Sequence, residues 1–528
     1  MLRALEIENF KGIAARQRVD FGPLTLLFGA NSAGKSTVLQ ALLYLHELLE
    51  RGTADVDRTE LGGNVLELGG FARLVHRHEA NRAIILRAEF ATPGGLERFG
   101  RDLADFPFPD LDDEVESAWL ELTIKLRTTA TFRGPLVERA IIGVGGDSEP
   151  LVWLETGVTL REGEPLNARV NLGHRLIAEG AREISDAWRQ IAVPEEALQR
   201  TLDAEEGGNG GGFGLGDGLG DALMIGNGRS LPVFAISRSR ISALPSSSES
   251  LRVISFGDDN KEKAAASAQV RTFLEMVVLG TTAQLVASLR DSLYIGPLRT
   301  IPPRGFLYER AGRITGWADG LAAWDLLLAD RTSLVERTNL WLRRLGAGCQ
   351  VVVQQLFDRT ADAELLSDGH VDKAVRRLLL DTGAGSLVLP SEVGAGVSQI
   401  IPVVVAALEA RAGLSLIEQP EIHVHPAVQV GLGDLFIDAA TRDRGRRTVL
   451  VETHSEHLIL RLLRRIRETT DNKLVDGSLA FSADKISVLY VESSSEGMRI
   501  HRLHVDERGE FTDRWPKGFF DERFAEVY

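Results

Sequence analysis

The feature that most constrains this chain is a segment near its N-terminus, Gly29-Ala30-Asn31-Ser32-Ala33-Gly34-Lys35-Ser36-Thr37. Its first eight residues match the pattern G-x-x-x-x-G-K-[ST] in full. An apolar run, 24–28, precedes it, and helically spaced leucines follow it. Glycines in such a loop let backbone N–H groups close around phosphates at the positive end of a helix. We therefore expect residues 29–37 to cradle ATP, with Lys35 reaching the β- and γ-phosphates and Ser36 binding Mg²⁺.

A second segment supplies the acidic residues that such a loop requires. The apolar run 414–417 leads into Glu418, Gln419 and Glu421. We expect Glu418 to hold the metal, directly or through water. Gln419 occupies the next position, where a carboxylate would activate the attacking water, and an amide cannot take a proton at neutral pH. Glu421 is the obvious substitute. The alternative is an acidic turn after a buried strand.

Two further segments complete the candidate site. His454 follows the apolar run 449–451, and a polar residue at the end of a central strand points at the ligand in open α/β sheets. Gly394 and Gly396 bare the backbone at the start of an apolar helix, with Ser398 and Gln399 in its first turns. This is a second anion-binding helix start. A structural histidine and a simple glycine-capped helix remain the alternatives.

Composition narrows the class of protein. The chain has 528 residues and a formal net charge of -15, which argues against a bulk affinity for nucleic acid. Its single cysteine, Cys349, excludes a disulfide framework and fits a reducing cytosol. The N-terminus is unlike a signal peptide, and we expect no membrane span, so the prediction is a cytoplasmic protein. DNA remains a possible partner through arginines that are either a basic face or ordinary surface, namely Arg442, Arg444, Arg446, Arg447, Arg461, Arg464, Arg465 and Arg467.

Strands that alternate with helices predict an α/β fold with a mostly parallel sheet and an antiparallel β subdomain. We expect an ATPase head made of an N-terminal lobe, 1–140, and a C-terminal lobe, 291–505. Residues 141–290 would form an inserted, largely helical segment with a glycine-rich flexible loop at 207–228. A C-terminal tail, 506–528, would follow.

Taken together, these motifs resemble those of ABC-type ATPases of the SMC/Rad50/RecF/OLD branch, and more closely those of related bacterial AAA-like ATPases. The carrying segments are Glu8 to Gly12 (ENFKG), Val393 to Gln399 (VGAGVSQ), Glu418 to Pro426 (EQPEIHVHP) and Val451 to Ser455 (VETHS). Tyr294 to Arg299 and a short tail, W-P-x-G-F-F-D, resemble an uncharacterised subfamily. The resemblance covers about 1–80 and 290–528. It implies a homodimer or higher oligomer in which Gly394, Gly396, Ser398 and Gln399 close on ATP held by the other copy.

Several functions are compatible with this resemblance. The first is a slow, ATP-gated switch or sensor, the ATPase subunit of a bacterial anti-phage defence complex that controls a separately encoded effector. A DNA repair or maintenance ATPase of the RecF/Rad50 type is the alternative. An OLD-type nuclease needs clustered acidic residues after His454, where Glu492 and Asp506 are too sparse. A transporter ATPase usually carries an Asp-Glu pair at the position of Glu418 and Gln419.

Overall fold

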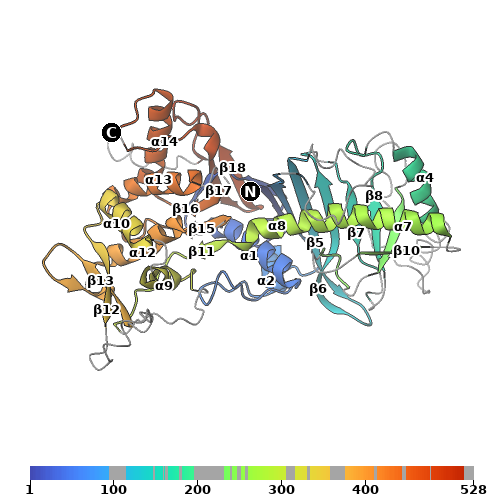
Figure 1. Ribbon diagram of the computed structural model, residues 1–528, viewed down its shortest axis with the longest axis horizontal. Helices are drawn as coiled ribbons and strands as arrows, with labels where there is room; N and C mark the ends of the chain where they lie inside the picture. The colour runs from blue at the N-terminus through green and yellow to red at the C-terminus, as the bar shows by residue number, and fades with distance from the viewer. Residues whose placement is uncertain are drawn as a thin grey trace, which may run out of the picture. The chain divides into compact units, whose positions relative to one another are not determined.

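Figure 1 shows the computed structural model of the chain. It describes residues 1–93, 95, 115–146, 149–157, 160, 165–177, 181–194, 231–237, 241–245, 251–255, 260–304, 316–329, 333–356, 375–409, 413–442, 447–475 and 477–516. The chain divides into two compact units. Unit one comprises 1–18, 44–57 and 69–290, and unit two comprises 19–43, 58–68 and 291–528. Every motif of the candidate site lies in unit two.

Unit two is built on a six-stranded sheet. Its strands, in sheet order, are β11 (Leu293–Ile295), β15 (Leu414–Glu418), β16 (Thr448–Glu452), β3 (Leu24–Gly29), β17 (Ile486–Ser494) and β18 (Gly497–Leu503). The first five strands run parallel, and only β18 is antiparallel to its neighbour. The central strands are buried along their whole length, as expected for a parallel sheet covered on both faces. This arrangement confirms the predicted α/β P-loop fold.

Helices cover the sheet and complete the core of unit two. They are α9 (Leu321–Ala329), α10 (Leu334–Leu345), α12 (Ala395–Leu408), α13 (Pro426–Thr441) and α14 (Glu456–Thr470), together with the short turns η6 (Pro390–Glu392) and η7 (Ala483–Lys485). α13 packs against both α12 and α14, side by side in Figure 1. Leu26, Ile417, Val451 and Val488 meet residues of these helices in one hydrophobic cluster. Pro402 lies inside α12.

A small antiparallel sheet also belongs to unit two, formed by β12 (Gln350–Leu356), β13 (Val375–Asp381) and β14 (Leu387–Val388). The helix that follows the P-loop, α1 (Lys35–Arg51), begins in unit two and ends in unit one. β2 (Gln17–Asp20) likewise crosses the boundary between the units.

Unit one holds a nine-stranded sheet in the order β10-β9-β8-β7-β6-β5-β4-β1-β2. Neighbours from β10 to β1 pair antiparallel. The bounds are β1 (Leu2–Glu8), β4 (Ile84–Ala91), β5 (Ser117–Thr128), β6 (Arg133–Val144), β7 (Val152–Glu155), β8 (Leu166–Val170), β9 (Val233–Ser237) and β10 (Arg252–Ile254). The helical elements are α2 (Phe71–Leu74), η1 (His76–His78), α4 (Ala181–Ile191), α7 (Lys261–Leu274), η4 (Glu275–Gly280) and α8 (Thr281–Arg290).

The stretch expected to be a largely helical insertion, 141–290, also contributes strands. β6 runs across residue 140, and β7 to β10 extend the antiparallel sheet. These four strands have five residues at most, and β7 and β9 are mostly apolar runs, which periodicity alone does not distinguish from a buried helix segment. The glycine-rich loop at 207–228 lies outside the described residues. The domain boundaries drawn from the sequence therefore remain predictions.

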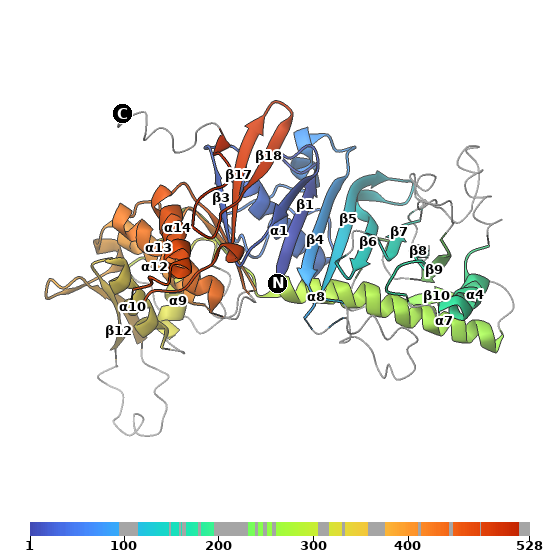
Figure 2. The ribbon, with the colours of Figure 1, turned by 90° about the horizontal axis from the view of Figure 1, so that it is seen from above.

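α7, η4 and α8 form one continuous helix that runs along the nine-stranded sheet, across its strands (Figure 2). This helix, Lys261–Arg290, has the length and composition of a membrane span, with a mean hydropathy of 1.4 in its most apolar window. However, 61% of that window is buried inside the protein, and the core helix of a soluble protein passes the same test.

Candidate functional site

The predicted nucleotide motifs meet at one edge of the six-stranded sheet. β15, β16 and β3 are adjacent and parallel, so their carboxyl ends lie together. Glu418 at the end of β15 pairs in register with Glu452 at the end of β16. β3 ends at Gly29, where the P-loop begins. Ligands of open α/β sheets bind at such an edge.

The P-loop has the backbone that its glycines were expected to provide. Gly29 and Gly34 have φ values of 149° and 98°. A Cβ at either position would come closer than 3.0 Å to its neighbour, the Val491 carbonyl oxygen or the Met498 sulfur. Ser32 takes a left-handed φ of 61°. The chain can follow this tight path around a phosphate only because both glycines lack a side chain.

Lys35 lies inside the loop, at the start of α1. Its Nζ donates to the carbonyl oxygens of Gly29 at 3.2 Å and Ala30 at 2.9 Å. Burial lowers the pKa of Lys35, and the carboxylates of Glu452, Glu421 and Glu418 oppose that shift. The ammonium is thus held beside the loop and close to the acidic groups, where a bound triphosphate would offer it further acceptors.

Two buried carboxylates face the hydroxyl predicted to bind the metal. Ser36 Oγ donates to Glu452 Oε2 at 2.8 Å, and Lys35 Nζ lies 4.0 Å from Glu452 Oε1. Tyr294 Oη donates to Glu418 Oε1 at 3.0 Å. Burial raises the pKa of Glu418 to about 7, and repulsion from Glu452 adds to the shift. A divalent cation would neutralise this concentrated negative charge.

The position next to Glu418 carries a backbone irregularity. Gln419 has a left-handed φ of 43°, which is uncommon for a residue other than glycine. Its backbone N–H donates to the Glu452 carbonyl oxygen at 2.7 Å. Strained backbone of this kind concentrates at functional sites.

Glu421 and His454 are joined across the site. The His454 backbone N–H donates to Glu421 Oε1 at 2.6 Å. Burial raises the pKa of the Glu421 carboxyl. Burial and nearby Lys35 lower the pKa of the His454 imidazole. A carboxylate with a raised pKa is better suited to accept a proton, so Glu421 fits the role of base that Gln419 cannot fill.

Several buried polar atoms at this edge have no hydrogen-bond partner among the described residues. They are Glu421 Oε2, His454 Nε2, and Arg299 Nε and Nη1. Buried polar groups are nearly always paired, so these atoms indicate where a ligand or water belongs. ATP fits this requirement because its phosphates accept hydrogen bonds and its attacking water donates them.

Mg²⁺ also fits the residues present. No group of three or more His, Cys, Asp or Glu side chains is placed to hold a metal among the described residues. Mg²⁺ does not need such a cage, since it is usually bound by one or two carboxylates together with phosphates and water. Ser36, Glu452 and Glu418 supply a hydroxyl and two carboxylates. When bound, the metal would neutralise phosphate charge.

The glycine-rich start of α12 divides into an exposed part and a buried part. Gly394 and Ala395 are exposed, and a Cβ at Gly394 would meet open space. Ser398 is buried instead, and its Oγ donates to the Pro390 carbonyl oxygen at 2.6 Å. Gln399 is also buried, with its amide bonded to the backbone of Arg299. The first backbone N–H groups of a helix have no partner within it, so this exposed start is free to bind an anion.

Sequence reasoning did not assign Glu452, Tyr294 and Arg299 to the site. Glu452 lies in the segment Val451 to Ser455. Its position at the end of an apolar strand, two residues before His454, is the sequence feature that indicates a place in the site. Tyr294 and Arg299 lie more than 100 residues before Glu418 in the sequence, so no local pattern connects them to it.

The arginines proposed to bind DNA are largely engaged within the protein. Arg447 is buried and donates to Ser415 Oγ and to the carbonyl oxygens of Ala406 and Ala407. Arg442 pairs with Asp438. Arg444 and Arg446 lie outside the described residues.

The arginines of α14 are likewise bonded, because Arg465 pairs with Asp434 and Glu468, and Arg464 pairs with Glu468. Arg467 donates to the Arg508 carbonyl oxygen.

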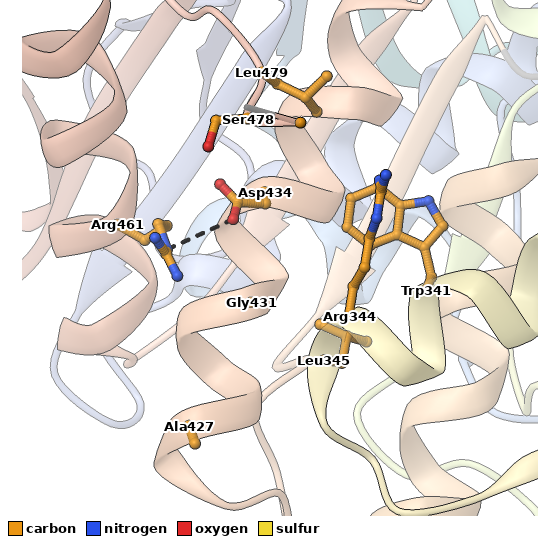
Figure 3. Close-up of a pocket in the computed structure, with 10 residues that line it drawn as sticks. Trp341, Arg344, Leu345, Ala427, Gly431, Asp434, Arg461, Ser478 and Leu479 are labelled. Carbon is orange, nitrogen blue, oxygen red and sulfur yellow. Dashed lines mark ion pairs between the residues drawn. The ribbon is translucent and has the colours of Figure 1, made fainter. Parts of the chain in front are cut away.

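A cavity of about 240 Å³ lies between α10, α13 and α14. Figure 3 shows Arg344 stacked on Trp341 on one side of it and the Asp434–Arg461 ion pair on the other. It includes none of the predicted nucleotide-binding residues.

Comparison with family models gives two matches to ATPase domains. A model described as "AAA ATPase domain" matches residues 1–90, which contain the P-loop. A model described as "AAA domain, putative AbiEii toxin, Type IV TA system" matches residues 318–461, which contain Gly394, Glu418 and His454. A third model, described as a protein of unknown function, DUF3696, matches residues 482–527. Comparison with curated proteins finds no match.

Among solved structures, the chain is similar to heads of SMC proteins. An Smc head bound to the C-terminal winged-helix domain of ScpA shares 10% identity over 96% of this chain and 98% of that chain, with a TM-score of 0.37. A second such head, from Pyrococcus furiosus, shares 10% identity over 95% of this chain and 96% of that chain, with a TM-score of 0.35. The SMC head domain from Thermotoga maritima shares 8% identity over 96% of this chain and 99% of that chain, with a TM-score of 0.35. Two segments of the chain thus match models of AAA ATPase domains, and the P-loop, Glu418 and His454 that they contain lie at or just beyond the ends of β3, β15 and β16.

Proposed function

We propose that this protein is an ATP-gated switch that dimerises head to tail around ATP and hydrolyses it slowly. The observation that supports this most is the exposed start of α12. Gly394 and Ala395 offer free backbone N–H groups, and no hydrogen bond among the described residues joins them to the P-loop of the same chain. A second copy would bring its own P-loop phosphates to this helix start.

Slow turnover follows from the residues that face the attacking water. Gln419 can orient a water molecule but cannot accept its proton. Glu421 is a carboxylate of the same turn, two residues after Gln419. We propose that Glu421 is the base and that its bond to the His454 backbone holds it in place. ATP would then persist long enough for the dimer to act as a signal.

We further propose that the switch controls a separately encoded effector, as in an anti-phage defence complex. The description of one matched family model names a putative toxin and a type IV TA system. A repair or DNA-maintenance ATPase remains the alternative. The bonds made by Arg442, Arg447 and Arg465 reduce the basic surface available for DNA.

The dimer is tested by measuring solution mass with and without Mg²⁺-ATP. We expect a rise from 57.7 kDa toward twice that mass in the wild type and no rise in Lys35→Ala. Gly394→Trp should fail to dimerise yet bind ATP normally, because its side chain enters open space.

Mixing the two variants gives a sharper test of action between copies. Lys35→Ala has an intact helix start, and Gly394→Trp has an intact P-loop, so a mixed dimer contains one complete site. We expect the mixture to recover hydrolysis that neither variant shows alone. A mixture as inactive as its components, with a mass indifferent to ATP, would overturn the head-to-tail mechanism.

A further inference from the structure

The start of α12 is tied to a buried arginine, Arg299, by a pair of hydrogen bonds. The Arg299 backbone N–H donates to Gln399 Oε1 at 3.0 Å. Gln399 Nε2 donates to the Arg299 carbonyl oxygen at 2.5 Å. The amide of Gln399 thus bonds both backbone groups of one residue, so Arg299 must follow any movement of this turn of α12.

The other end of Arg299 holds the segment that follows β15. Its Nη2 donates to the carbonyl oxygens of Glu418 at 2.5 Å and of Gln419 at 3.3 Å. The side chain is buried, and that burial lowers the pKa of Arg299 to about 10 while Glu421 and Glu418 oppose the shift. A charged donor on these carbonyls fixes the orientation of the Glu418–Gln419 peptide.

A second contact joins the same two segments. A Cβ at Gly396 would come closer than 3.0 Å to the carbonyl oxygen of His423, so the start of α12 lies directly on the turn after Gln419. His423 itself has a left-handed φ of 64°. The helix start and the 419–423 turn are therefore packed without space between their backbones.

We propose that Arg299 is a positioning residue that transmits engagement of the α12 start to the groups that act on the attacking water. This inference rests on the proposed function, because it assigns a consequence to the binding of a second copy at Gly394. The guanidinium is bonded to the turn that carries Gln419 and precedes Glu421, and Gln399 holds its backbone. A shift of α12 therefore changes the placement of both residues.

The left-handed backbone of Gln419 makes the turn after β15 sensitive to loss of the hydrogen bonds that hold it. Such a conformation persists only where surrounding bonds hold it. Two sets of bonds do so, the Gln419 N–H bond to the Glu452 carbonyl and the Arg299 bonds to the neighbouring carbonyls. Loss of the second set would let the turn relax and would move Gln419 and Glu421 away from the water.

The test is a double-mutant cycle on Arg299→Met and Gln399→Met, with Arg304→Met as the matched control. Arg304 is an exposed arginine of the same segment, with 79% of its side chain accessible. The measurements are the Kd for a fluorescent ATP analogue and the single-turnover hydrolysis rate. We expect Arg299→Met and Gln399→Met each to keep the Kd for the analogue within about twofold of the wild-type value. Each should lose at least tenfold in the single-turnover hydrolysis rate. The double variant should be no slower than the slower single, since both changes break one connection.

Arg299→Lys should recover part of the rate, because a lysine restores one donor to the carbonyls. Hydrogen exchange of the peptides that cover 417–424 should rise in Gln399→Met and not in Arg304→Met. This readout remains informative if Arg299→Met fails to fold. Additive losses of rate, or unchanged exchange in Gln399→Met, would overturn the proposal. A wild type whose mass does not change with ATP would overturn the dimer and, with it, the transmission of engagement. A non-additive cycle in the same protein would still support Arg299 as the residue that positions the turn after β15.

Discussion

Replacing Gly396 by alanine should destabilise the protein, although an alanine usually stabilises a helix. The added Cβ would come closer than 3.0 Å to the His423 carbonyl oxygen, and two more backbone atoms would lie at 3.2 and 3.5 Å. Overpacking against rigid backbone costs about 1–3 kcal/mol. The gain from replacing glycine is about 0.4–1 kcal/mol. The midpoints of the two ranges leave a loss of about 1.3 kcal/mol in the free energy of unfolding.

Gly394→Ala is the matched control, because it lies two residues earlier with φ -57° and no atom within 4 Å of its Cβ. We expect its free energy of unfolding to stay within about 0.5 kcal/mol of the wild type. Thermal unfolding should show Gly396→Ala melting about 2 °C lower. The chain has two units, so a change in melting temperature alone does not say which unit is destabilised. Faster hydrogen exchange in peptides that cover 414–425 would place the loss of stability at this turn. Equal stability of the two variants would refute the close packing of α12 on the turn.

Three further predictions concern other parts of unit two. Arg447→Met leaves Ser415 Oγ and two carbonyls at the end of α12 without their donor. Urea unfolding should therefore show a loss of about 3 kcal/mol in the free energy of unfolding. The control Arg442→Met, at a half-buried arginine, should lose under about 1 kcal/mol. Glu452→Gln should raise the Mg²⁺ concentration that half-saturates nucleotide binding by about tenfold, and an unchanged metal requirement would remove Glu452 from the site. Burial raises the pKa of Cys349 to about 11 from 9.0, so its thiol should react with a disulfide reagent at pH 8 about 100-fold more slowly than in the unfolded chain, with the rate rising toward pH 11.

Much of the parallel sheet was predictable from the sequence because its strands are short apolar runs that end in polar residues. The runs 24–28, 414–417 and 449–451 correspond to β3, β15 and β16. The helix expected after the P-loop and the apolar helix expected to start at 394–396 correspond to α1 and α12. These elements have strong local patterns, such as the helically spaced leucines of α1.

The rest depended on contacts between distant residues. No local pattern shows that Gln399, expected to bind a phosphate, is bonded to Arg299 instead. Ser398 was also assigned by its place in a motif, whereas its hydroxyl is used within the protein. The roles of both residues in ATP binding remain predictions. The antiparallel strands β7 to β10 were missed because they are short, and because the apolar runs of β7 and β9 do not alternate with polar residues.

Pro402 gives α12 a mechanical property of its own. A proline has no backbone N–H, so the carbonyl of Ser398, four residues earlier, lacks its helical bond. The helix is therefore easier to bend between these two residues than elsewhere along its length. Gly394 to Gln399 form the part of the helix before the bend, while Val403 to Leu408, after it, are buried in the core. Contact at the exposed N-terminal end would therefore rotate residues 394–399 and leave the hydrophobic core in place.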